Sequence, residues 1–224
     1  MPSRKTTPSA PTPFEVDYHP YVFQDGRLIG EFERMYQEAT VVPWHQDRVA
    51  EAWPTHVMLS MLRPCAPFDT ALDIGCGLGY ATARLAELCG RTRGVDISQT
   101  AIERARTLFP NLEFEVLDIR TPPREALGPF SLIVSKEVLW FVIPELSEVL
   151  DRLKEMVRPG GWLLMCQSFP QLEQPFYGKD TLPNPEHLMR LLAQRLTPVA
   201  SCVCMEHDRP GNGPMLIALL RRHV

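Results

Sequence analysis

The 224-residue sequence lacks the features that mark several classes of protein. Its six cysteines include no C-x-x-C pair and show no disulfide framework, which is typical of a reducing cytoplasm. Cys202 and Cys204 can share one face of a strand, but the sequence around them offers too few further ligands, so we expect no metal site. There is no run of 18 apolar residues, and residues 1–13 resemble a flexible Pro/Ser/Thr-rich tail rather than a secretion signal. These absences predict a cytoplasmic protein without a membrane partner.

The sequence also lacks an excess of charge of either sign. It has 23 Lys and Arg against 27 Asp and Glu, a formal net charge of −4. Such a balance gives no general attraction to the phosphates of nucleic acids. We therefore expect a small-molecule acceptor and no nucleic acid partner, and the sequence leaves a monomer or a homodimer open.

Strand-like and helix-like stretches alternate along most of the chain. This pattern predicts an α/β fold, a Rossmann-like open and mostly parallel sheet with helices on both faces. Turn residues at 208–213 indicate a C-terminal antiparallel hairpin. We expect strands at 70–74, 92–97, 112–117, 130–134, 162–167, 197–206 and 215–221, and helices at 80–89, 98–109, 144–157 and 185–195.

A helical segment is expected ahead of this sheet. Apolar residues recur at helical spacing over 28–39, and a second helix is predicted over 47–62, with a kink at Pro54. We therefore divide the chain into the tail, a helical N-terminal segment over residues 14–66 that covers the site, and a ligand-binding domain over residues 67–224.

Three glycines, Gly75, Gly77 and Gly79, occupy alternate positions directly after a predicted strand. Without a Cβ, such a turn lets a ligand approach the backbone, and the helix that follows directs unpaired N–H groups at it. Asp73 precedes the glycines, and its carboxylate suits a cationic ligand better than a pyrophosphate. S-adenosylmethionine carries an ammonium and a sulfonium. We therefore expect these four residues to bind that cofactor, whose demethylated product is S-adenosylhomocysteine.

Carboxylates end the next two predicted strands. Asp96 follows the last of these glycines by 17 residues, where its oxygens can accept both ribose hydroxyl hydrogen bonds. Asp118 can bind an adenine amino group, with Ile97 and Ile119 on either side of the ring, although it can equally be a solvated carboxylate. Because ligands of such sheets bind beyond the carboxyl ends of the strands, we expect these residues to share one crevice.

Two other functions remain open at this point. A nicotinamide-dependent oxidoreductase would also use a glycine-rich turn and Asp96, but the spacing here is G-x-G-x-G, and Tyr80 occupies the place of the third dinucleotide glycine. A non-catalytic module that only binds S-adenosylmethionine would carry the same donor residues.

Candidates for the chemistry come from two places. Ser135 and Glu137 follow the buried fourth strand, where Ser135 can contact the donor and Glu137 can orient or deprotonate an amine nucleophile. The N-terminal segment supplies His45 as a second candidate base, together with Tyr36 and Trp44, which we expect to contact the donor.

The run from Leu72 to Met165 resembles the class I S-adenosylmethionine-dependent methyltransferases. The matching motifs are Leu72–Gly79, Val95–Ser98, Leu117–Ile119 and Leu153–Gly161. A closer resemblance, to the nodulation N-methyltransferases that act on deacetylated chitooligosaccharides, is carried by Phe32–Tyr36, Pro43–Trp44, Asp96–Ser98 and Ser135–Trp140. The resemblance implies a seven-stranded sheet, donor contacts from Gly75, Gly77, Asp96 and Asp118, and a methyl transfer to a nitrogen or oxygen of a small molecule, with nitrogen favoured.

Overall fold

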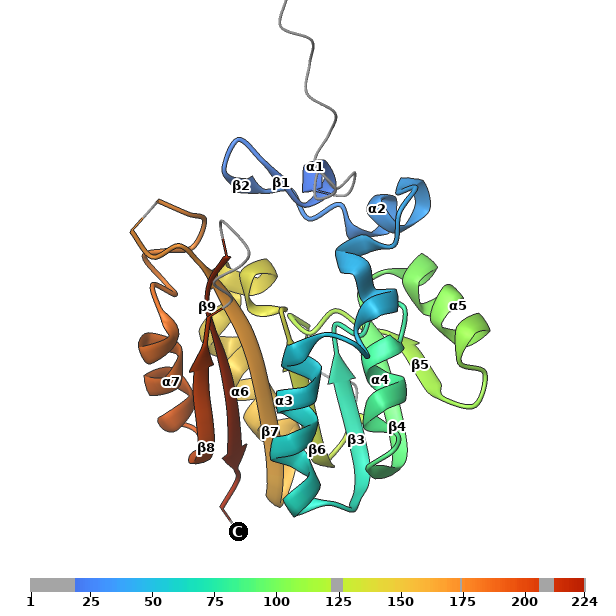
Figure 1. Ribbon diagram of the computed structural model, residues 1–224, viewed down its shortest axis with the longest axis vertical. Coiled ribbons are helices and arrows are strands. Elements are labelled where there is room, and N and C mark those ends of the chain that lie inside the picture. Colours follow the sequence, from blue (N-terminus) through green and yellow to red (C-terminus); the bar gives the residue numbers. More distant parts are fainter. Residues whose placement is uncertain (1–18, 122–126, 174, 206–211, 224) are drawn as a thin grey trace, which may run out of the picture.

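The computed structural model describes residues 19–121, 127–173, 175–205 and 212–223. Its centre is a seven-stranded sheet in the order β5-β4-β3-β6-β7-β9-β8 (Figure 1). The strands are β3 (Phe68–Ile74), β4 (Cys89–Asp96), β5 (Glu113–Val116), β6 (Phe130–Lys136), β7 (Val157–Pro170), β8 (Thr197–Cys204) and β9 (Asn212–Arg221). The expected α/β fold and its seven strands are therefore confirmed.

The first five strands of the sheet are parallel and the last strand pairs are antiparallel. β3 lies between β4 and β6, with Asp73 opposite Gly94 on one side and Val134 on the other. β9 pairs antiparallel with both β7 and β8, as the predicted hairpin requires. The expected turn at 208–213 falls largely outside the described residues.

Helices cover both faces of the sheet (Figure 1). On one face, α3 (Trp53–Leu62) and α4 (Tyr80–Leu85) bury Met58, Leu62 and Leu85 against the strands, and α5 (Gln99–Leu108) packs beside β5. On the other face, α6 (Leu146–Met156) and α7 (Pro185–Ala193) complete the larger core cluster. No helix in the described part of the chain is long and apolar enough to cross a bilayer.

Residues 19–48 of the N-terminal segment lie over the end of the sheet to which the β3 arrow points (Figure 1). They form α1 (His19–Val22), a hairpin of β1 (Phe23–Gln24) and β2 (Arg27–Leu28), α2 (Phe32–Glu38), and the 3₁₀ helix η1 (Pro43–Arg48). The 3₁₀ helix η2 (Arg63–Cys65) follows α3 and precedes the start of β3, at the opposite end of the sheet. The tail expected over residues 1–13 lies outside the described residues. The domain boundary at residue 66 stays a prediction. Helix α3 precedes this boundary in the sequence, yet it packs on the sheet.

Several element boundaries differ from those predicted. The helix expected over 28–39 begins only at Phe32, because residues 27–28 pair with residues 23–24. The helix expected over 47–62 begins at Trp53, so Pro54 occupies its first turn and causes no kink; a proline there needs no N–H. Likewise, α6 starts after Pro144, which lies in the 3₁₀ helix η4 (Leu139–Glu145).

Strand pairing explains two further differences. The helix expected to end at Cys89 stops at Leu85, because Cys89 already pairs with Phe68 and Gly90 lies inside β4. The turn expected at 158–161 is instead an irregularity within β7, where the register against β6 shifts between Phe130 and Leu132.

Candidate functional site

The glycine-rich turn joins the end of β3 to the start of α4. All three of its glycines have positive φ, at 69°, 52° and 83° for Gly75, Gly77 and Gly79. The turn is held by the neighbouring strand, since the N–H groups of Gly75 and Cys76 both donate to the carbonyl oxygen of Val95. The conformation predicted from the glycine spacing is therefore present at the carboxyl edge of the sheet.

The N-terminal segment packs directly on this turn through Gln46, a residue that the sequence did not single out. A Cβ added to Gly77 would lie 2.6 Å from the Tyr36 hydroxyl oxygen and closer still to the Gln46 amide. The Leu78 N–H donates to Gln46 Oε1 at 2.8 Å, and Gln46 Nε2 donates to the Tyr36 hydroxyl at 2.9 Å. Tyr36 is buried here, and burial raises its pKa well above the ordinary value; its contact with the donor stays a prediction.

Asp96 lies at the end of β4 and organises the turn. Its Oδ2 accepts from the Gly77 N–H and its Oδ1 from the Ser98 N–H, each at 2.9 Å. Burial raises the pKa of Asp96, although these backbone hydrogen bonds oppose the shift. Each carboxylate oxygen can accept a second hydrogen bond, so a ribose role remains chemically possible.

Asp73 is almost fully buried, with 2% of its surface exposed. Its Oδ2 accepts from the Thr82 hydroxyl at 2.6 Å, a contact from α4 that sequence reasoning missed. Burial raises the pKa of Asp73 to about 6. A carboxylate held this way is costly to keep ionised, and a nearby cation would lower that cost.

The expected adenine residues lie beyond β5 and β4. The Asp118 carboxylate makes an ion pair with Arg120, 2.8 Å between Oδ2 and Nη2, and also accepts from the Arg120 N–H. Burial would raise the pKa of Asp118, but the hydrogen bonds from Arg120 outweigh it and lower the pKa. Ile97 is exposed and Ile119 is buried. An adenine contact would therefore use an Asp118 carboxylate that already has a partner.

Ser135 and Glu137 follow β6. Ser135 is buried, and its hydroxyl oxygen has no hydrogen-bond partner among the described residues. Glu137 has a strained φ of +59°, and burial raises its pKa. Its Oε2 accepts from the Ser168 hydroxyl at 2.7 Å and from Gln167 Nε2 at 3.1 Å, while its Oε1 accepts from the Ser168 N–H at 3.0 Å. The carboxylate thus anchors the turn after β6 onto β7.

The second candidate base lies in η1. His45 and Trp44 both have positive φ, near 50°, so this short helix is distorted at the two residues. The His45 ring makes no hydrogen bond to any described residue and is half-buried. Trp44 packs against Phe141, which follows β6, with ring centroids 6.1 Å apart. The aromatic packing therefore joins the N-terminal segment to the residues that follow β6.

Glu33 on α2 fastens the same segment to the start of α5. It accepts from the Ser98 hydroxyl at 2.6 Å, the Thr100 hydroxyl at 2.6 Å and the Thr100 N–H at 3.1 Å. Ser98 is the N-cap of α5, and its hydroxyl also accepts from the Ala101 N–H. Burial would raise the pKa of Glu33, but these donors outweigh it and lower the pKa.

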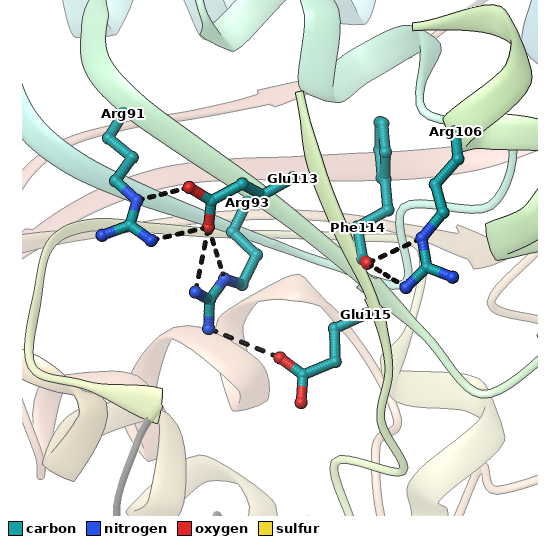
Figure 2. Close-up of polar contacts among 6 residues, drawn as sticks. All are labelled: Arg91, Arg93, Arg106, Glu113, Phe114 and Glu115. Carbon is teal, nitrogen blue, oxygen red and sulfur yellow. Dashed lines mark hydrogen bonds and ion pairs between the residues drawn. The ribbon is translucent and has the colours of Figure 1, made fainter. Parts of the chain in front are cut away.

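A depression lies at the β5 edge of the sheet, and Figure 2 shows the polar contacts of residues that line it. It is lined by charged side chains that are already paired: Arg93 with Glu113 and Glu115, and Arg106 with the carbonyl oxygen of Phe114. None of the predicted site residues lines it, so we assign it no part in the chemistry.

These observations fit the donor that the sequence predicted. The turn brings Gly77 directly against the Gln46 and Tyr36 side chains, and two buried carboxylates lie beside it. A cationic ligand suits that pair of carboxylates, whereas a pyrophosphate would be repelled. Whether each predicted residue touches the donor stays a prediction.

Residues 71–161 match the family described as a methyltransferase domain. A trans-aconitate 2-methyltransferase from Deinococcus radiodurans is 34% identical over 123 residues, which cover 54% of this chain and 45% of that protein. Nodulation protein S from Rhizobium tropici is 31% identical over 128 residues, which cover 54% of this chain and 53% of that protein. The chain thus spans about half the length of these curated relatives.

The fold is also similar to a solved structure, the N-methyltransferase NodS from Bradyrhizobium japonicum WM9 in complex with S-adenosyl-L-homocysteine. The TM-score is 0.64 at 23% identity, and the match covers 82% of this chain and 89% of that chain. This similarity is one of fold.

Proposed function

Since residues 71–161 form a methyltransferase domain of the class I, S-adenosylmethionine-dependent type, we propose that the protein transfers a methyl group from S-adenosylmethionine to a small-molecule acceptor. The family match confirms the resemblance predicted from the motifs. Nitrogen is the favoured acceptor atom and oxygen the alternative. The motifs that resemble the nodulation N-methyltransferases, such as Ser135–Trp140, support an amine acceptor.

The observation that carries this proposal is the cover over the glycine-rich turn. Gln46 and Tyr36 close directly on Gly77, while Glu33 ties α2 to α5. A segment placed over the carboxyl edge of the sheet leaves little access for a polymer and favours an acceptor that fits beneath it. The net charge of −4 agrees with this, because it does not attract nucleic acids.

When bound, S-adenosylmethionine supplies an electrophilic methyl group and a neutral thioether leaving group. The chain's own residues bind and orient the donor and the acceptor. Asp96 accepts ribose hydroxyl hydrogen bonds, Asp73 opposes the positive charge, and the cover excludes water. Holding a nucleophile in line can contribute about 7–11 kcal/mol to the lowering of the barrier.

Glu137 and His45 remain the two candidates for the base. The geometry favours His45, because both oxygens of Glu137 already accept hydrogen bonds from Ser168 and Gln167. In this proposal Glu137 positions the turn after β6, and His45 accepts a proton from the acceptor. An amine that enters the pocket neutral needs no base at all.

Two measurements test the proposal. S-adenosylhomocysteine, but not NADH, should raise the melting temperature, and the reverse result would support an oxidoreductase. Incubation of the protein with isotope-labelled S-adenosylmethionine and a metabolite extract should then give a labelled small product by mass spectrometry. Donor binding without any labelled product would instead support a non-catalytic module.

Six free thiols also support placing the protein in the reducing cytoplasm.

A further inference from the structure

Sulfur atoms gather on one face of the antiparallel end of the sheet. Cys202 and Cys204 lie on the same face of β8, with their Sγ atoms 3.5 Å apart. On β9, Met215 lies opposite Cys204, and its Sδ is 3.6 Å from the Sγ of Cys166 on β7. Three adjacent strands thus carry two pairs of sulfur atoms in contact, and the register of Cys204 opposite Met215 places the two pairs on the same face.

We propose that Cys202, Cys204 and Met215 form a binding site for a soft monovalent metal ion, of which Cu(I) is the representative. Thiolate and thioether sulfurs are the ligands that Cu(I) prefers. Cys202 and Cys204 are the charged ligands, and Met215 is the neutral third ligand from the neighbouring strand. The sequence predicted no metal site here because Met215 is adjacent only in the folded sheet.

The ligand set argues against a harder ion. Zinc in structural sites takes four nitrogen, sulfur or oxygen ligands. Within the described residues, no group of three or more His, Cys, Asp and Glu side chains lies close enough to hold a metal ion. Two thiols and a thioether meet the lower coordination number of Cu(I), and they leave Cys166 as a buried thiol behind the site.

The spacing of the two thiols suits a shared ion better than a disulfide. Two sulfurs bound to one ion at about 2.3 Å are roughly 3.8–4.0 Å apart at tetrahedral or trigonal angles. The observed 3.5 Å is close to this separation. A disulfide needs an S–S distance of about 2.05 Å and Cα atoms most often about 5.5–6 Å apart, whereas the Cα atoms of residues i and i+2 of a strand are about 6.4–6.8 Å apart, at the upper end of the disulfide range.

The two thiols are accessible. Both are half-buried on a strand at the edge of the sheet, so an ion reaches them from solvent. Binding of Cu(I) forms two Cu–S bonds to the thiols, which release their two protons to solvent, with no change of oxidation state.

A competition titration tests the site. The reduced full chain is titrated with Cu(I) under nitrogen in the presence of the colorimetric chelator bicinchoninate. We expect the wild type to withdraw one Cu(I) per chain. Cys202→Ser and Cys204→Ser should each bind at least tenfold more weakly, and Met215→Leu, which keeps an apolar side chain of similar volume, should weaken binding several-fold.

Cys65→Ser and Cys89→Ser are the matched controls, since both thiols are also half-buried but neither lies on β7, β8 or β9. They should bind like the wild type, and circular dichroism should show that every variant folds. Failure of the wild type to withdraw copper would overturn the proposal, as would equal losses in the control variants. Unchanged binding in Met215→Leu would remove Met215 from the site. A methyltransferase assay is not needed for any of these outcomes.

Discussion

At the scale of single residues, Asp96 has a structural role and a proposed binding role that a mutation can separate. Its carboxylate holds the Gly77 and Ser98 N–H groups and is proposed to bind the donor ribose. Alanine would remove both, so Asp96→Asn is the sharper variant, because one carbonyl oxygen remains as an acceptor. We expect a 10- to 100-fold loss of S-adenosylhomocysteine affinity by calorimetry with the fold retained, from the loss of about 1.5–3 kcal/mol in hydrogen bonds to a charged group.

Asp69→Asn serves as the control for this variant. Asp69 lies at the opposite end of β3 and pairs with Arg158 on the surface. The Asp69→Asn variant should have unchanged affinity for S-adenosylhomocysteine. An Asp96→Asn protein that binds S-adenosylhomocysteine like the wild type would refute the ribose role.

Gln46 supports a second prediction at this scale. Replacing it with alanine leaves the Leu78 N–H and the Tyr36 hydroxyl without their partner. We expect a roughly 5- to 100-fold lower affinity for S-adenosylhomocysteine, because the segment over the turn is no longer held in place and must be ordered when the donor binds, and the hydrogen bonds that held it are worth about 1–3 kcal/mol. Asp47→Ala, in the same turn but exposed, should have little effect. Tighter binding by Gln46→Ala would mean that this side chain competes with the donor for the Leu78 N–H.

The predictability of individual residues depends on what positions them. The glycines and Asp96 could be predicted because strand ends of a parallel sheet meet at one edge. Gln46, Glu33 and Thr82 could not, because their roles depend on which side chain approaches which backbone group after folding. The Gln46–Leu78 contact spans 32 positions and the Glu33–Thr100 contact spans 67.

At the scale of secondary-structure elements, α2 depends on Glu33 for its attachment to α5. Removing that side chain should let the N-terminal segment open while the sheet remains intact. We expect Glu33→Ala to be cut at least tenfold faster by trypsin after Arg27, Arg34 or Arg48, with a small change in melting temperature. Peptide mapping by mass spectrometry would locate the cuts.

Glu31→Ala is the matched control, because Glu31 precedes the same helix but pairs only with the exposed Arg34. Cleavage of this variant should match the wild type. Equal protection of the Glu33→Ala segment would show that the aromatic packing around Phe141 suffices to hold the cover.

Element prediction succeeded where periodicity and pairing agree. The buried strands β3 and β6 were found from apolar runs, but β4 begins earlier than expected because Cys89 pairs with Phe68. The hairpin of β1 and β2 was missed, although Asp25 and Gly26 carry a usable signal. Both have positive φ, and an Asp-Gly pair between two short extended runs is typical of a two-residue hairpin turn.

At the scale of the whole molecule, Asp73 links stability to pH. Burial raises its pKa from 3.8 to about 6, so between these values the folded chain binds more protons than the unfolded chain. The stability that this group contributes is therefore complete below about pH 4 and is lost as the pH rises through 6. A shift of this size corresponds to about 3 kcal/mol.

Asp73→Asn removes this titration while keeping an oxygen that can accept from Thr82. Measured by urea unfolding between pH 4 and pH 7.5, the variant should gain up to about 3 kcal/mol relative to the wild type as the pH rises. Asp69→Asn, whose carboxylate is exposed, should show no such trend. The same Asp73→Asn protein should bind S-adenosylmethionine more weakly, because the cationic donor loses its opposing charge. A stability difference that does not change with pH, together with unchanged donor affinity, would mean that the wild-type Asp73 carboxyl is already neutral at pH 7 and cannot select a cation. The expected pair of results would instead show that the fold tolerates a buried charge because that charge attracts the donor.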